Sequence, residues 1–105
     1  MTESSTGKPG DAVLEQRGAE TRLPRLYKVL LHNDDYTTME FVVEVLEEVF
    51  AKSPAEAFRI MMHVHQSGLG VCGAYPFEIA ETKVATVHER ARKLGFPLRA
   101  SLEEE

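Results

Sequence analysis

The chain has 105 residues, of which 43% are hydrophobic and 28% are charged. This length suits one domain, and the composition is that of a globular protein with a buried core. The net charge of −5 argues against a phosphate-binding surface, because affinity for nucleic acids depends largely on Lys and Arg. We therefore expect a protein or peptide partner and no nucleic acid.

The sequence carries no sign of a membrane span or of export. Its apolar runs fall far short of the roughly 20 residues that cross a bilayer. Its first residues lack the basic and apolar segments of a secretory signal, so we expect a cytoplasmic protein without a membrane partner. The single cysteine, Cys72, has no second thiol for a disulfide or a zinc site, and we interpret it as a small buried side chain.

Residues 1–23 combine Ser, Thr, Gly and Glu with scattered aliphatic residues, and this composition predicts a flexible arm. The folded domain is expected over residues 24–105. It begins with "RLYKVLLH" at 25–32, where β-forming residues run into a polar cluster and predict a strand.

The next segment opens with the polar turn "NDD" at 33–35 and then shows a helix start. Thr37 and Glu40 have the spacing of a capping box, in which each side chain satisfies a backbone amide of the first turn. The following "MEFVVEVLEEVFAK" at 39–52 carries an apolar and an acidic stripe, which predicts an amphipathic helix.

"SPAE" at 53–56 combines a Ser N-cap with Pro at the first helical position, a strong start signal. It predicts a second helix over 54–67 that Gly68 closes in a left-handed conformation. The apolar positions of this helix form a broad face, namely Ala57, Phe58, Met61, Met62 and Val64.

The glycine-rich segment that follows predicts a short strand at 69–74, and apolar spacing of three and four predicts a third helix over 77–94. "FPLRASL" at 96–102 alternates and predicts a closing strand. The order strand, helix, helix, strand, helix, strand indicates an α+β domain, with three helices packed on one face of a small, mainly antiparallel sheet.

Local chemistry alone favours modest interpretations of the polar residues. Asp34 and Asp35, between a strand and a helix, are typical of turns that cap backbone amides. His63 and His65 lie two apart on a helix and point about 200° apart, so they cannot chelate one metal ion. However, Met39 follows the acidic turn, and Met61 lies one helical turn before His65. These thioethers suit a recess that accepts several apolar shapes.

Three blocks of the sequence, "YKVLLHNDDYTTMEFVVEVL", "MMHVHQSGLGVCG" and "AETKVATVHERARKLGFPL", resemble the bacterial ClpS adaptors. The resemblance covers about residues 25–103 in the same order. It implies a compact α+β domain without catalytic activity, cofactor or metal. Such a domain binds proteins bearing a destabilising N-terminal residue and delivers them to a ClpA-type or ClpC-type AAA+ unfoldase.

The resemblance also implies roles for individual residues. Asn33, Asp35 and His65 would bind the free α-amino group of the ligand, and Asp34 would reinforce the negative potential. The walls of an apolar pocket for Leu, Phe, Tyr or Trp, with Thr37 at its mouth, would be Met39, Val42, Met61, Val64 and Leu98.

A separate surface is implied for the unfoldase, with Glu78 and Lys83 docking on its N-terminal domain and the arm needed for delivery. We expect a monomer. One departure is Thr38, where the family commonly has Pro; at the first helical position this exchange would leave the capping box intact.

Two other function classes fit parts of the sequence. One is an interaction module of the ribosomal-stalk type, which docks on partners without a pocket. The other is a small metal-dependent hydrolase that uses Asp34 and Asp35. Only the adaptor hypothesis requires distant residues to converge, with Asn33, Asp35 and His65 meeting beside the apolar residues Met39, Met61 and Leu98.

Overall fold

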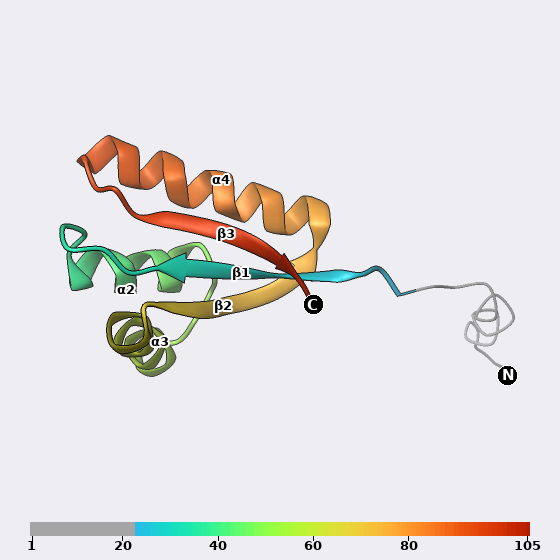
Figure 1. Cartoon of the computed structure of the whole chain (residues 1–105), viewed down its shortest axis with the longest axis horizontal. Coiled ribbons are helices and arrows are strands. Elements are labelled where there is room, and N and C mark those ends of the chain that lie inside the picture. The colour runs from blue at the N-terminus through green and yellow to red at the C-terminus, as the bar shows by residue number, and fades with distance from the viewer. Residues whose placement is uncertain (1–22) are drawn as a thin grey trace, which may run out of the picture.

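The computed structural model describes residues 23–105, so nearly all of the predicted arm lies outside the described residues. The described elements, in chain order, are β1 (Leu26–His32), α2 (Met39–Glu48), α3 (Pro54–Ser67), β2 (Leu69–Pro76), α4 (Phe77–Leu94) and β3 (Arg99–Glu104) (Figure 1). This order confirms the predicted α+β fold class.

The sheet of the described domain has the strand order β2-β1-β3, and both pairings are antiparallel. β1 is therefore the central strand. β3 begins at Arg99 rather than at the predicted residue 96, and Pro97 just before it has no N–H to donate to a ladder. At the other end β3 reaches Glu104 because that residue pairs with Tyr27 of β1.

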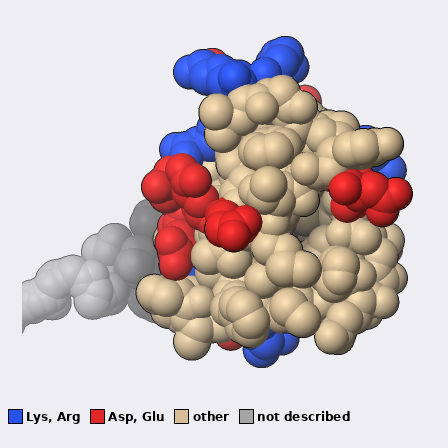
Figure 2. Space-filling model, turned by 90° about the vertical axis from the view of Figure 1, so that its left-hand side faces the viewer, with Lys and Arg blue, Asp and Glu red and all other residues tan. Residues whose placement is uncertain are grey.

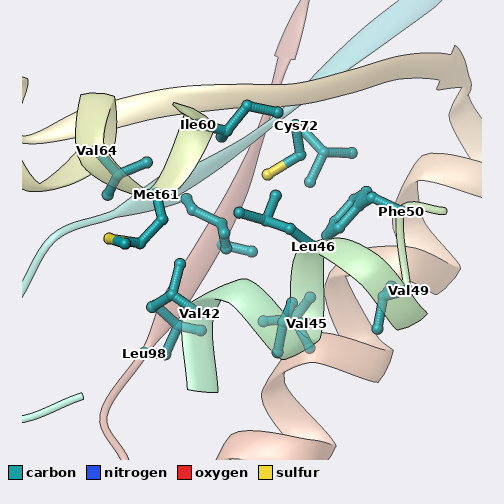
Figure 3. Close-up of a cluster of buried hydrophobic side chains, with 14 of the residues drawn as sticks. Val42, Val45, Leu46, Val49, Phe50, Ile60, Met61, Val64, Cys72 and Leu98 are labelled. Atoms are coloured by element: carbon teal, nitrogen blue, oxygen red, sulfur yellow. The ribbon is translucent and has the colours of Figure 1, made fainter. Parts of the chain in front are cut away.

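All three helices pack on one face of this sheet. The alternation of β1 turns Val29 and Leu31 toward the helices, and both are fully buried. They belong to one core cluster with buried residues from all three helices, and Figure 3 shows part of it: Val42, Val45, Leu46, Val49, Phe50, Ile60, Met61, Val64, Cys72 and Leu98.

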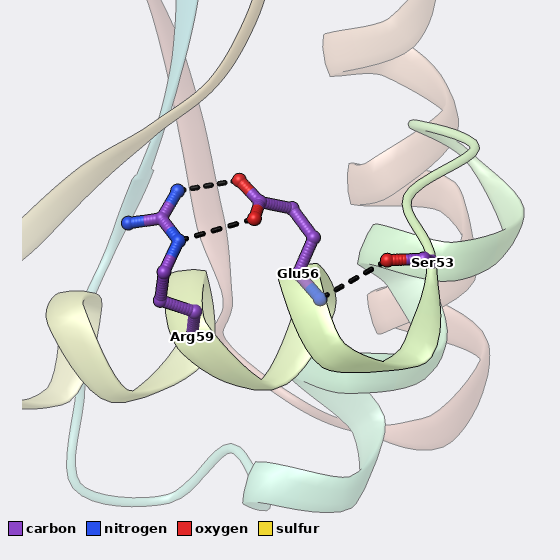
Figure 4. Close-up of polar contacts among 3 residues, drawn as sticks. All are labelled: Ser53, Glu56 and Arg59. Carbon is purple, nitrogen blue, oxygen red and sulfur yellow. Dashed lines mark hydrogen bonds and ion pairs between the residues drawn. The ribbon is translucent and has the colours of Figure 1, made fainter.

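α3 has the bounds that its start and stop signals predict. The Ser53 hydroxyl accepts a hydrogen bond from the Glu56 amide at 3.2 Å, and Arg59 donates to the Glu56 carboxylate at 3.1 Å (Figure 4). Gly68 ends the helix with φ 97°, the left-handed conformation that glycine adopts without strain. Phe58, which was predicted to lie on the apolar face of this helix, is 56% exposed and is not part of the buried face.

The start of α2 differs from the prediction. The N-cap is Thr38, whose hydroxyl oxygen accepts from the Phe41 amide at 3.1 Å, so there is no capping box between Thr37 and Glu40. Thr37 instead donates its hydroxyl to the Asp34 carboxylate at 2.8 Å. A hydrogen bond to an ionised carboxylate is stronger than one between two neutral groups, which favours Asp34 as the partner of the Thr37 hydroxyl. The residue at the position where the family commonly has Pro is thus the cap itself.

α2 also ends at Glu48, before the end of the amphipathic pattern. Ala51 has φ 55°, a left-handed conformation that a helix cannot continue through. The Lys52 amide then donates to the Leu46 carbonyl at 3.1 Å, which closes the turn toward α3.

Asp34 organises the turn between β1 and α2. Its carboxylate accepts hydrogen bonds from the amides of Tyr36 at 2.8 Å and Thr37 at 2.7 Å, in addition to the Thr37 hydroxyl. Burial of the Asp34 carboxylate raises its pKa, but the hydrogen bonds from Thr37 and Tyr36 lower it, and the resulting pKa lies below the ordinary value. The ionised form is therefore the one that the turn stabilises.

Lys83 joins α4 to the end of α2. Its ammonium donates to the Val49 carbonyl at 2.8 Å and lies over the rings of Tyr75 and Phe50, at 5.1 and 5.8 Å from their centroids. On the same helix, the His88 imidazole accepts from the Ala100 amide of β3 at 3.0 Å. α4 is thereby tied to both of its neighbours.

Replacing Asp34 by Asn should lower the free energy of unfolding near neutral pH by about 1 kcal/mol, because the charged acceptor of three hydrogen bonds is lost. A group with a lowered pKa contributes stability above its ordinary pKa and loses it as the pH falls through the lowered value. The difference between the two proteins should therefore shrink on acidification. Urea unfolding at a series of pH values measures this, with Glu44→Gln at an exposed site of α2 as control; a pH-independent difference would contradict the role of charge.

Replacing Lys83 by Met should lower the free energy of unfolding by about 1–2 kcal/mol, because the Val49 carbonyl loses its donor and the two rings lose a cation. Met keeps the aliphatic stem, so packing is largely retained. Lys93→Met, at an exposed position in the last turn of α4, is the matched control. Urea unfolding in which both variants lose equal stability would refute the tie.

Candidate functional site

A pocket of about 280 Å³ lies where the turn after β1, the start of α2 and the second half of α3 meet. This volume is just below the range of sites for drug-sized ligands and suits one large side chain. The lining is polar on one side and apolar on the other, and consists of Asn33, Asp34, Asp35, Thr37, Met39, Val42, Met61, Val64 and His65.

One backbone hydrogen bond brings the two halves of the polar side together. The Asn33 amide donates to the Gly68 carbonyl at 2.8 Å, so the turn after β1 is held against the end of α3. His65 lies in the last turn of that helix, just before Gly68. Residues that are far apart in sequence are therefore neighbours at one end of the molecule.

The adjacent polar residues of this turn divide into two kinds. The Asp34 carboxylate lines the pocket, but its oxygens already accept three hydrogen bonds within the turn. The side chains of Asn33, Asp35 and His65 are exposed, and within residues 23–105 none of them is hydrogen-bonded to another side chain. The Asp34 carboxylate can therefore act on a ligand only through its charge, which is the role predicted for it, whereas the other three acceptors are exposed to solvent.

The apolar side of the pocket is the surface of the core. Val42, Met61 and Val64 are almost fully buried, whereas Met39 is 44% exposed at the rim. Leu98, which the family resemblance places in the wall, is also buried but does not line the pocket. It belongs to the same buried core cluster as Val42, Met61 and Val64 (Figure 3).

The surface around this end of the molecule is shown in Figure 2, which faces the left-hand end of Figure 1, where β1 passes into α2. Most of it is uncharged and hollowed near the middle, and acidic residues gather on two sides. The charged residues of the pocket lining are Asp34 and Asp35. Their field favours a cation at the rim over an anion.

The other sequence-predicted residues lie elsewhere. Glu78, in the first turn of α4, is exposed. Lys83 is half-buried and bound to Val49, so its ammonium is largely occupied within the domain. Cys72 is buried, and burial raises the pKa of its thiol to about 12. The thiol is therefore protonated at neutral pH and is a poor nucleophile.

Residues 23–105 contain no group of three or more His, Cys, Asp or Glu side chains placed to hold a metal ion. Within the same range, no helix combines the length and the apolar character of a membrane span.

Comparison with known proteins gives consistent matches. A protein from Nitratidesulfovibrio vulgaris strain Miyazaki F, described as an ATP-dependent Clp protease adapter protein ClpS, is 65% identical over 85 residues, covering 81% of this chain and 85% of that protein. A protein of the same description from Phenylobacterium zucineum is 51% identical over the full length of both.

A solved structure is also similar. Agrobacterium tumefaciens ClpS2 bound to L-phenylalaninamide superposes with a TM-score of 0.76 at 43% identity, covering 79% of this chain and all of that one. The family model described as ATP-dependent Clp protease adaptor protein ClpS matches residues 22–101, almost the whole described domain. The chain therefore belongs to the ClpS family of Clp protease adaptors.

Proposed function

We propose that this chain binds the free N-terminal residue of degradation substrates, when that residue is Leu, Phe, Tyr or Trp, and delivers them to a ClpA-type or ClpC-type AAA+ unfoldase. The observation that carries the proposal is the pocket, in which exposed acceptors from two distant segments meet above an apolar wall. The similar ClpS2 structure holds an amino-acid amide, which is a mimic of a peptide N-terminus.

The polar rim suits a free amino terminus. An α-amine has a pKa near 8, so at neutral pH it is mostly cationic and presents three donors. The Asn33 carbonyl, the Asp35 carboxylate and an unprotonated nitrogen of His65 are three acceptors for it. An internal peptide N–H supplies one donor and no charge, which leaves desolvated acceptors at a cost of about 1–3 kcal/mol each. The rim thus discriminates chain starts from chain interiors.

The apolar wall suits a large side chain that is not branched at Cβ, either aliphatic, as in Leu, or aromatic. Burying a Leu or Phe side chain contributes about 1.5–3 kcal/mol, and the pocket volume of about 280 Å³ accommodates one such group. The half-exposed Met39 stands at the mouth. In the family, crowding at this position is held to exclude most residues with a branched Cβ.

Delivery would use a second surface on α4. Glu78 and Lys83 are its proposed members, with Glu78 as the freely exposed charge. Lys83 holds the junction of α2 and α4 beneath it. This division of binding and docking needs no catalytic group and no cofactor. A pocket-free interaction module of the ribosomal-stalk type would not require exposed acceptors above an apolar recess.

A peptide that starts with free Leu or Phe should bind, and acetylating its amine should weaken binding by at least about tenfold, since the charge and two donors are lost. Val or Lys in first position should weaken binding to a similar degree. Titration of fluorescent peptides by anisotropy measures both. Equal binding of the free and acetylated peptides would refute the amine site.

Replacing Asp35 by Ala should abolish binding of the free-Leu peptide and leave the free energy of unfolding within about 0.5 kcal/mol, because its exposed carboxylate supports no other side chain. Glu44→Gln, which removes an exposed acid outside the pocket, is the matched control and should bind normally. Anisotropy and urea unfolding on the same samples separate the two effects. A variant that unfolds would show that Asp35 is structural.

A further inference from the structure

A second apolar groove adjoins the pocket on the surface of α2 and α3. It has a volume of about 400 Å³ and is lined by Met39, Glu40, Val43, Phe58 and Met61. Met39 and Met61 also line the first pocket. The two recesses are therefore separated by a ridge made of these two methionine side chains.

The outer wall of the groove is an aromatic side chain that the fold does not bury. Ala57, Ile60, Met61 and Val64 form the buried stripe of α3, and Phe58 follows that stripe by one position, or about 100° around the helix. It is 56% exposed, and Met39 across the groove is 44% exposed. This arrangement leaves an aromatic ring and a thioether exposed to solvent beside a pocket that suits one large side chain.

The chemistry of a bound N-terminal residue sets the direction in which the substrate chain leaves. At its Cα, the amine, the side chain and the carbonyl carbon diverge at about 111°. With the side chain in the pocket and the amine on Asn33, Asp35 and His65, the carbonyl carbon points away from those acceptors. Met39 and Met61 line both the pocket and the groove, so a chain that leaves the pocket across these two side chains enters the groove.

The geometry of an extended chain then indicates which residue of the substrate reaches the groove. Side chains of consecutive residues point to opposite faces, so the first and third side chains face the same surface, about 6.6 Å apart along the chain. The second side chain points away from the protein. A single amino-acid amide, the kind of ligand named for the similar ClpS2 structure, contains no third residue and reaches only the first pocket.

We propose that the groove between α2 and α3 is a subsite for an apolar third residue of the bound substrate, with Phe58 as its outer wall and the Met39–Met61 ridge shared with the first pocket. This inference rests on the proposed function, because it takes the first residue as anchored in the pocket. Its ligand is an aliphatic or aromatic side chain, since the groove lining has one charged residue, Glu40, and four apolar ones.

The test is a titration of three peptides that all begin with free Leu: one continues with Ser only, one has Leu in third position, and one has Leu in second position. The peptide with Leu in third position should bind about three- to tenfold more tightly than the all-Ser peptide, as partial burial of one Leu provides. Leu in second position should change the affinity less than twofold.

Phe58→Ser should abolish the gain from the third Leu and leave the affinity for the all-Ser peptide unchanged, because Phe58 does not line the first pocket. Ser and Phe have similar helix propensities, so α3 should remain folded. Ile79→Ser is the matched control, since Ile79 is 49% exposed near the start of α4, at the other end of the helix layer in Figure 1. This variant should keep the full gain.

The outcomes separate this inference from the function on which it rests. If all three peptides bind the wild-type protein equally, the subsite is refuted and the pocket stands. If Leu in second position gives the gain, or if Phe58→Ser retains it, the assignment of the groove to the third residue is wrong. If no free-Leu peptide binds the folded protein, the proposed function itself fails.

Discussion

The hydrogen bond from the backbone amide of Asn33 to the backbone carbonyl of Gly68 is the contact on which the pocket depends. It continues the pairing of β1 with β2 by one step beyond His32 and Leu69, and so joins the end of the first strand to the end of α3. It holds the acceptors of the turn beside the last turn of α3, which carries His65. The antiparallel ladder thus extends to the pocket and holds its two polar segments next to each other.

Within that frame, neighbouring acidic residues have different tasks. The Asp34 carboxylate accepts its hydrogen bonds from Tyr36 and Thr37 and so shapes the turn. Asp35 is exposed to solvent, and it is the acid that we propose as an acceptor for the ligand's amine. Because the Thr38 side chain caps α2, the start of the helix does not use the side chain of Asn33 or Asp35 as a cap. The hydrogen bonds of the turn and the proposed amine site thereby use alternate side chains of one short segment.

On the apolar side of the pocket, stability and pocket shape are not divided between different residues, because the wall residues also belong to the core. Val42, Met61 and Val64 are buried members of the core cluster and lining residues at once, whereas Leu98 belongs to the core cluster alone. Changes in the pocket wall therefore alter packing as well as binding. By contrast, Met39 and Phe58 are largely exposed and lie outside the core cluster, so these two positions can vary at little cost to the fold.

The order of elements, the bounds of α3 and α4 and the single apolar face of each helix were predictable from the sequence, because caps, glycine stops and periodicity act between residues a few positions apart. The same local signals could not decide which of Thr37 and Thr38 caps α2, since that choice depends on the competing carboxylate of Asp34. Nor could they show that Phe58 lies outside the buried face, that Leu98 is buried without lining the pocket, or that Lys83 donates to the Val49 carbonyl. By itself, the sequence determined the fold class and the residue types available for binding an amino terminus. Only the tertiary structure decided which of them share a pocket, because the ladder and the packing of α2 on α3 connect residues that no local spacing relates.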